Sequence, residues 1–287
     1  LSEVINMEAI KAAGPKTLVD TLGGSGASYW KAIKERYGLD LTIIHDEYDP
    51  TFSFMTYDHD GKVRMDCSSS YVMESVINRI GDFDLAVGND PDYDRYGIVI
   101  SSGLVSANSF LTMAARYLFT TRGWKNKGIG KTVVCTTMID KWAASVEIPV
   151  FEVPVGFKYF SQLLFDGVIG IGGEESAGAS FLKKDGTVWT TDKDGIIMAL
   201  LSMEIMAVMG KSALKMADDF AENYGEPRFG RIDAPCKKEQ KQILKQLSAE
   251  LITATSVDGD PITGIRTTSM YNNMPIDGVR VETDKGW

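Results

Sequence analysis

The segment GNDPDYDRYG, residues 88–97, carries the residues whose types and spacing point most directly to chemistry. Asp90, Asp92 and Asp94 alternate along it, and Arg95 follows them. Three carboxylates this close repel one another, so either a bound cation offsets them or water fully solvates the loop. Carboxylate oxygens are the ligands that hard cations such as Mg²⁺ and Ca²⁺ prefer. Because the loop follows an apolar run, at the strand end where open α/β sheets bind ligands, we predict a cation site here.

Two well-known aspartate loops fit this segment poorly. A calcium EF-hand needs glycine and a late glutamate where Arg95 and Ser101 stand. The DxDx[TV] loop of the haloacid-dehalogenase phosphatases needs Thr or Val where Asp94 stands. A solvated acidic turn remains the alternative to a cation site. Arg95 is suited either to orient one carboxylate or to reach a phosphate group.

A second polar loop and two lysines also follow or begin predicted elements. GEESAG, residues 173–178, comes after the strand VIGIG, and its Glu174 and Ser176 alternate, as hydrogen-bonding groups for vicinal sugar hydroxyls would. VPVGFKYF puts Lys158 after Gly156 at a predicted helix start, and TTDKDG puts Lys193 at another. Helix starts attract anions, and a lysine there strengthens such a site. Taken singly, a lysine in such a position is most often a solvated surface charge.

The elements that would carry these loops form two alternating series. In the first, the patterns predict strands over 16–20, 39–45 and 82–88 and helices over 27–38 and 68–81. In the second, after a helix over 106–124, they predict strands over 131–137, 149–154 and 168–172. Helices over 137–146, 157–167 and 193–210 and a hairpin over 181–191 complete that series, and the methionines of the last helix are explained by core packing.

This order predicts an α/β fold in which two successive units with mainly parallel sheets are followed by the start of an α+β domain. We place the first unit at 1–104, the second at 105–227 and the incomplete third at 228–287. The third holds a basic helix over 237–251 and a hairpin signal over 274–287. The turn GGSG, residues 23–26, lacks the third glycine of a dinucleotide fingerprint, since Tyr29 stands there, and is explained as a tight turn.

Composition narrows the classes of partner. With 39 acidic and 30 basic residues the formal net charge is −9, which argues against nucleic acid or an anionic membrane as a partner. Three cysteines without CxxC pairing indicate reduced thiols in a cytoplasmic protein, and two histidines leave little material for a zinc site or a Ser-His-Asp triad.

We find neither a signal peptide nor a membrane span. Because the chain begins with Leu1 and stops within a strand pattern, we expect a piece of a longer protein.

Taken together, GNDPDYDRYG, VPVGFKYF, GGEESAG and TTDKDG resemble, in order and spacing, the α-D-phosphohexomutases, and among them the bacterial α-phosphoglucomutases. MDCSS in the first unit and DGVRVETDKGW at the end extend the resemblance over nearly the whole chain. The resemblance implies a four-domain isomerase that interconverts glucose 1-phosphate and glucose 6-phosphate. Transfer would pass through a phosphoserine and a glucose 1,6-bisphosphate intermediate, which also serves as activator, and the chain would hold the second and third domains and part of the fourth.

By matching positions, the resemblance also implies a role for each site residue. One Mg²⁺ would be held by Asp90, Asp92 and Asp94, with Arg95 beside the phosphoserine. The hexose phosphate would be bound by Glu174, Ser176, Gly156, Phe157 and Lys158, and Lys193 would be the general acid. Oligomeric state does not follow from any of these patterns.

Three departures from the family pattern shape the functional expectation. Neither the phosphoserine segment T-x-S-H-N-P nor the phosphate-binding segment R-P-S-G-T-E occurs in the sequence, and Gly178 stands where some relatives carry histidine. We therefore expect the isolated chain to be inactive. Two other functions remain open: another phosphohexomutase, such as a mannose- or glucosamine-phosphate enzyme, or a non-catalytic fragment that binds sugar phosphates.

Overall fold

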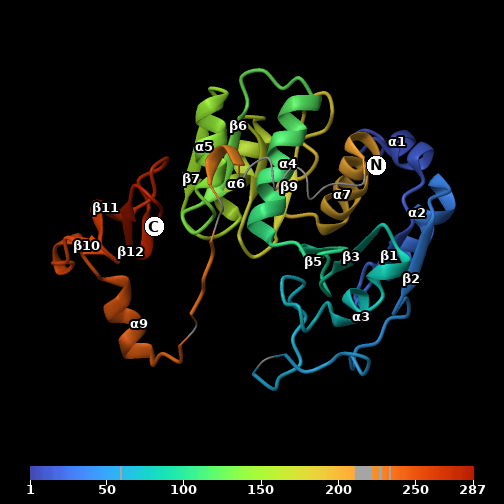
Figure 1. The fold of residues 1–287 in the computed structure, drawn as a ribbon, viewed down its shortest axis with the longest axis horizontal. Helices are drawn as coiled ribbons and strands as arrows, with labels where there is room; N and C mark the ends of the chain where they lie inside the picture. The colour runs from blue at the N-terminus through green and yellow to red at the C-terminus, as the bar shows by residue number, and fades with distance from the viewer. Residues whose placement is uncertain (59, 211–221, 226–227, 233) are drawn as a thin grey trace.

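The structure is a computed structural model of the chain, and it describes residues 1–58, 60–210, 222–225, 228–232 and 234–287. Two α/β units lie side by side, with helix α7 between them, and a smaller C-terminal unit extends beside the second (Figure 1). The predicted boundary between residues 227 and 228 adjoins residues outside the described part of the chain.

The first unit contains a five-stranded mixed sheet in the order β2-β1-β3-β4-β5. Strand β1 pairs in parallel with β2 and β3, whereas β3–β4 and β4–β5 are antiparallel. Every residue of β1, β3 and β4 is buried, which explains their nearly continuous apolar runs. The strands are β1 Thr17–Asp20, β2 Leu41–Ile44, β3 Leu85–Asn89, β4 Tyr96–Ile100 and β5 Gly103–Leu104, and the helices are α1 Met7–Ala13, α2 Ala27–Tyr37 and α3 Glu74–Ile77.

The second unit contains a four-stranded sheet in the order β7-β6-β8-β9. Its central strand β6 pairs in parallel with β7 and β8, and β9 runs antiparallel to β8. Ser106 caps the first helix by accepting a hydrogen bond from the backbone N–H of Ser109. The elements are α4 Ala107–Thr121, β6 Gly128–Thr132, α5 Met138–Ser145, β7 Val150–Val153, α6 Lys158–Phe165, β8 Ile169–Gly173, β9 Ala179–Phe181 and α7 Gly195–Met209.

The two sheets share one topology, because β2-β1-β3-β4 corresponds strand for strand to β7-β6-β8-β9. The aspartate loop, residues 90–95, joins β3 to β4, and the glutamate loop, residues 174–178, joins β8 to β9. The two polar loops singled out from the sequence are therefore the same loop of a repeated unit. The predicted α/β class and the repeat of architecture are both confirmed.

Helix α7 follows the second sheet in sequence but also covers the first. It contacts α1, β3 and β4 as well as β9 and α4, and its buried methionines belong to a core shared by both units. Its buried Glu204 receives hydrogen bonds from Arg122 at 2.6 Å, Tyr117 at 2.8 Å and the backbone N–H of Asn6 at 2.8 Å. A helix that is apolar on all sides must be buried on all sides, and α7 meets this need by lying between the sheets.

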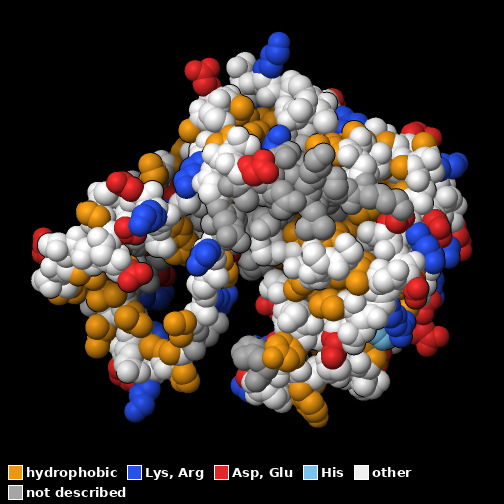
Figure 2. All heavy atoms as spheres, in the orientation of Figure 1, with side chains coloured by type: hydrophobic (Ala, Val, Ile, Leu, Met, Phe, Trp, Pro, Cys, Tyr) orange, Lys and Arg blue, Asp and Glu red, His pale blue; other side chains and the backbone are white. Residues whose placement is uncertain are grey.

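The C-terminal unit consists of α9 Lys238–Lys245 and the sheet β10-β11-β12, with strands Ser256–Val257, Asp260–Thr268 and Pro275–Thr283. It attaches to edge strand β7, where Glu152 accepts hydrogen bonds from Arg266 at 2.7 Å and Arg280 at 3.1 Å. Apolar side chains gather on the surface of this unit near α9 (Figure 2), including Ile243 and Leu251, whose exposed fractions are 65% and 63%.

Several predicted elements differ in the structure. The strand predicted at 131–137 runs from Gly128 to Thr132 instead, since its glycines allow Phe151 and Phe160 to pack against it. The helix predicted at 68–81 shrinks to α3 and the 3₁₀ turn Ile80–Asp82, and the basic helix ends at Lys245.

The two predicted hairpins are also wrong. After β9, residues 182–191 form a turn without a second strand. β12 pairs with β11, which lies upstream of the predicted hairpin and was not expected. Helix α1 and the antiparallel strands β4 and β5 were likewise not predicted. None of the helices in the described part of the chain combines the length and apolarity needed to cross a bilayer.

Candidate metal and substrate site

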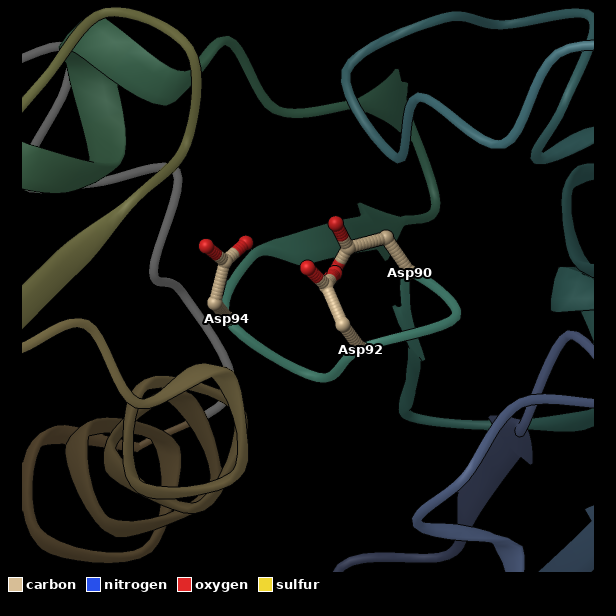
Figure 3. Close-up of side chains that lie close together, drawn as sticks. All are labelled: Asp90, Asp92 and Asp94. Carbon is tan, nitrogen blue, oxygen red and sulfur yellow. The ribbon is translucent and has the colours of Figure 1, made fainter.

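The aspartate loop brings its three carboxylates together. One oxygen from each of Asp90, Asp92 and Asp94 can be chosen so that all three lie within 4.8 Å of one another. Figure 3 shows the side chains gathered over one side of the loop, between the end of β3 and the start of β4. Asp90 is buried, Asp94 is half-buried and Asp92 is exposed, so the group opens to solvent on one side.

Local hydrogen bonds impose this curl. The Asp90 carbonyl accepts from the backbone N–H of Tyr93 at 3.0 Å, and its carboxylate oxygen Oδ1 accepts from the N–H of Arg95 at 2.9 Å. Tyr93 takes a left-handed backbone conformation with φ of 63°. Non-glycine residues adopt this conformation uncommonly, so the surrounding contacts must hold the loop in place.

The negative charges of the three carboxylates are only partly offset by a neighbouring arginine. Arg95 Nε lies 3.5 Å from Asp90 Oδ2 and 3.7 Å from Asp94 Oδ1. Burial, together with the neighbouring carboxylates of Asp92 and Asp94, raises the pKa of Asp90 to about 7. Asp94 Oδ1 is buried without a hydrogen-bond partner among the described residues. A divalent cation fits this donor set. It would coordinate Asp94 Oδ1 and would offset the repulsion among the three carboxylates.

The glutamate loop turns its carboxylate toward the segment before α6. The ends of the loop are joined by a hydrogen bond of 2.8 Å from the Glu174 N–H to the Gly178 carbonyl. Glu174 Oε1 accepts from the N–H of Gly156 at 3.1 Å, and burial raises the pKa of Glu174. Ser176 lies half-buried in the turn of the loop. Glu174 and Gly156 are therefore brought together from two different strand ends.

Lys193 contacts both loops and the segment before α6. Its Nζ lies 3.1 Å from Asp94 Oδ2 and 5.2 Å from the centroid of the Phe157 ring. Its alkyl stem passes so close to Gly178 that a Cβ there would overlap Lys193 Cδ. Burial lowers the pKa of Lys193, but the carboxylates of Asp192 and Asp94 outweigh this effect and leave its pKa above the usual value. Lys193 is thus an ammonium group at neutral pH.

Backbone contacts join the two loops directly. The Tyr96 N–H donates to the Ala177 carbonyl at 3.2 Å, and Arg95 forms an antiparallel bridge with Gly178. The aspartate and glutamate loops therefore face one another, as two loops at equivalent ends of two units must if they share a cleft.

Lys158 lies outside the ion-pair network of Lys193 and the aspartate loop. It is the exposed first residue of α6, and its ammonium group lies over the ring of Tyr159, 5.1 Å from the centroid. Within the part of the chain that the structure describes, it makes no ion pair with a carboxylate. The neighbouring Phe157 is buried and faces Lys193.

Two acidic residues near the loops were not singled out from the sequence. Asp66 lies 4.0 Å from Arg95 Nη1, and Glu175 Oε2 accepts from Thr132 Oγ1 at 3.1 Å. Asp66 lies in the MDCSS segment, which the resemblance included without a role. Glu175 stands beside Glu174, but no spacing signal distinguishes the two glutamates before the loop is folded.

Comparison with known proteins identifies relatives along most of the chain. Residues 1–103 match the family model "Phosphoglucomutase/phosphomannomutase, alpha/beta/alpha domain II", and residues 106–224 match that of domain III. A phosphoglucomutase of Komagataeibacter xylinus is 46% identical over the whole chain, which covers 52% of that relative.

Two solved structures share the fold. The phosphoglucomutase pp63/parafusin of Paramecium, in its open form, matches 99% of the chain and 52% of its own, with a TM-score of 0.70 and 18% identity. A putative phosphomannomutase of Thermus thermophilus matches 76% of the chain and 48% of its own, with a TM-score of 0.64 and 24% identity. The chain spans about half of the length of each of these relatives.

Proposed function

Since this chain belongs to the phosphoglucomutase/phosphomannomutase family, we propose that the complete protein interconverts α-D-glucose 1-phosphate and glucose 6-phosphate. The reaction moves a phosphoryl group between two oxygens of one hexose, by way of a phosphoserine and glucose 1,6-bisphosphate. The observation that carries the proposal is the 3.1 Å ion pair of Lys193 with Asp94, which joins a candidate proton donor to a candidate metal ligand. Phosphoryl transfer depends mainly on such positioning and on charge stabilisation.

We assign the cation to the aspartate loop, with Asp90, Asp92 and Asp94 as the residues that would hold Mg²⁺. Carboxylate ligands suit Mg²⁺, which usually keeps several of its waters. When bound, the cation would neutralise negative charge on the transferring phosphoryl group. Arg95 contributes a further positive charge at the loop, and we assign it to the phosphoryl oxygens.

We assign the hexose to the surface beside the two joined loops. Glu174 and Ser176 would hydrogen-bond its hydroxyls, since a carboxylate accepts and a serine hydroxyl both donates and accepts. Gly156 and Phe157 would form the wall beside Glu174. Lys158, the exposed residue at the start of α6, is assigned to the outer part of the substrate, where its ammonium group can turn toward a phosphate.

Lys193 is the proposed general acid. It is an ammonium group at neutral pH, so it carries the proton that would pass to the sugar oxygen that loses its phosphoryl group. Its contact with Asp94 would hold the ammonium group beside the transferring phosphoryl.

We also propose the boundaries of the units, the cofactors and the cellular compartment. We divide the chain into units at 1–104, 105–227 and 228–287, of which the first two carry one loop each. Mg²⁺ and, for the complete protein, glucose 1,6-bisphosphate are the proposed cofactors. The three cysteines are unpaired, which favours a reducing compartment such as the cytoplasm.

A phosphomannomutase is the second candidate, because the family description names both enzymes and Glu174 with Ser176 does not fix the epimer. The test is turnover by the complete protein on glucose 1-phosphate and on mannose 1-phosphate, with the matching bisphosphate present. We expect a higher kcat/KM on the glucose substrate, and the 287-residue chain alone to show no turnover on either. A preference for mannose 1-phosphate would replace the proposed substrate, and turnover on neither would contradict the mutase function itself.

A further inference from the structure

The glycine turn before α2, which the sequence explains only as a tight connection, packs against the aspartate loop. The Ser25 N–H and hydroxyl both donate to the Pro91 carbonyl, at 2.9 Å and 3.0 Å. A Cβ on Gly26 would overlap the ring of Tyr93, which is itself buried. The aspartate loop can therefore pack against this turn only because the residues of the turn are small at the point of contact.

A buried amide fixes the two ends of the same loop. Asn89, the last residue of β3, has no exposed surface. Its Nδ2 donates to the Arg95 carbonyl at 2.9 Å, and its Oδ1 accepts from the indole N–H of Trp30 at 3.0 Å. Asn89 thus closes the loop across its base and ties it to α2, the helix that follows the glycine turn.

The opposite side of the loop rests on the start of α7. The N–H of Gly195, the first residue of α7, donates to the Tyr93 carbonyl at 2.9 Å. The three aspartates are consequently held between two rigid supports, although none of the supporting residues points a charge at them. Supports of this kind orient ligand side chains without touching the ion.

We propose that Asn89, bridging Trp30 and the Arg95 carbonyl, is a positioning residue that sets the spacing of the three carboxylates for a divalent cation. The glycine turn supports the same loop through its contacts with Pro91 and Tyr93. The proposal rests on the assignment of Mg²⁺ to the aspartate loop. It adds residues that contact neither the cation nor the sugar.

The test compares Asn89→Leu, which keeps the branched shape of the side chain but removes both hydrogen bonds, with Val87→Ala. Val87 is also buried in β3 but lies outside the loop, so its truncation costs stability without changing the carboxylates. Mg²⁺ affinity is measured by calorimetry on folded protein, and hydrogen exchange is followed at residues 90–95. We expect Asn89→Leu to weaken Mg²⁺ binding by ~10-fold or more and to speed exchange in the loop. Val87→Ala should leave both unchanged.

Trp30→Phe provides the second variant, because it removes the indole donor while keeping an aromatic ring at this buried position. Combined with Asn89→Leu it should weaken Mg²⁺ binding no further than Asn89→Leu alone, as expected of residues that act through one network. Equal affinity and equal loop exchange in wild type and Asn89→Leu would overturn the proposal. If the wild-type chain binds no Mg²⁺, the assigned metal site fails, and loop exchange alone then decides whether Asn89 holds the loop.

Discussion

Lys193 Nζ and Asp94 Oδ2 lie 3.1 Å apart, although one belongs to the segment before α7 and the other to the loop between β3 and β4. This ion pair makes the proposed proton donor a neighbour of the proposed metal site. Changes at Lys193 should therefore affect the two functions with opposite signs.

Lys193→Met tests that coupling. Loss of the proton donor should lower kcat of the complete protein by ~10²-fold or more. Mg²⁺ affinity should stay equal or increase, because the ammonium group no longer competes with the cation for Asp94. Turnover assays and calorimetry measure the two effects. Weaker Mg²⁺ binding in this variant would contradict the proposed arrangement.

Asp92→Asn tests the ligand set itself. Asp92 is the exposed member of the group, so its replacement should leave the fold intact while removing one charged ligand. We expect Mg²⁺ affinity to fall, with far-UV circular dichroism unchanged. Asp40→Asn is the matched control, since Asp40 is exposed and precedes β2 at the amino end of the parallel strands, away from the loop. If both variants keep wild-type affinity, the metal site lies elsewhere.

The raised pKa of Asp90 gives the site a pH dependence. In the metal-free fold its pKa is about 7, against about 4 in the unfolded chain, so the folded state holds an extra proton between these values. Its contribution to the stability of metal-free protein is therefore present at low pH and is lost as pH rises through about 7. Mg²⁺ must displace that proton, so affinity should increase with pH and level off above about 7. Calorimetry across this range checks it, and a pH-independent Kd would count against it.

Gly178→Ala tests the close passage of the lysine stem. The added Cβ would overlap Lys193 Cδ, so the ammonium group must move away from Asp94. We expect kcat of the complete protein to fall while Mg²⁺ affinity is retained. Ala177→Ser, which changes the neighbouring loop residue by one hydroxyl, is the control. Wild-type kcat in Gly178→Ala would show that the lysine need not lie over the loop.

Glu204→Ala tests the junction between α7, α4 and the N-terminal segment. It would leave the Arg122 guanidinium, which is only 8% exposed, without its partner, so we expect a loss of about 3–5 kcal/mol in the free energy of unfolding. The surface pair of Glu3 with Lys183 is the control, and Glu3→Ala should cost much less, because solvent screens this pair. Urea unfolding distinguishes the two. Similar losses for both variants would argue against a central role for this junction.

The sequence was informative wherever a local pattern determines a local structure. The apolar run before Asp90 and the VIGIG run before Glu174 predicted strands whose ends carry the polar loops, and both strands formed. The helices predicted at 106–124 and 193–210 also formed, as α4 and α7.

What could not be predicted depends on contacts distant in sequence. Helix α7 is apolar on every face, and nothing in its sequence says that one face covers the first unit's sheet. The glycine turn at 23–26 has the letters of an ordinary turn, and its relation to the aspartate loop is seen only in the folded chain, where Tyr93 packs against Gly26 and Ser25 donates to Pro91. At 68–81 the opposite error occurred. The apolar spacing predicted one long helix, but the segment forms only a short helix and a 3₁₀ turn.

The central claim is that one cation-binding loop and one sugar-binding loop, from two copies of the same α/β unit, form a single site. Paramagnetic broadening by Mn²⁺, used in place of Mg²⁺ on isotope-labelled chain, tests it most directly. The account predicts that Mn²⁺ broadens the amide signals of Gly178 and Lys193 together with those of residues 90–95, and that Asp92→Asn weakens the effect. Broadening confined to other parts of the chain, or unchanged in Asp92→Asn, would contradict it.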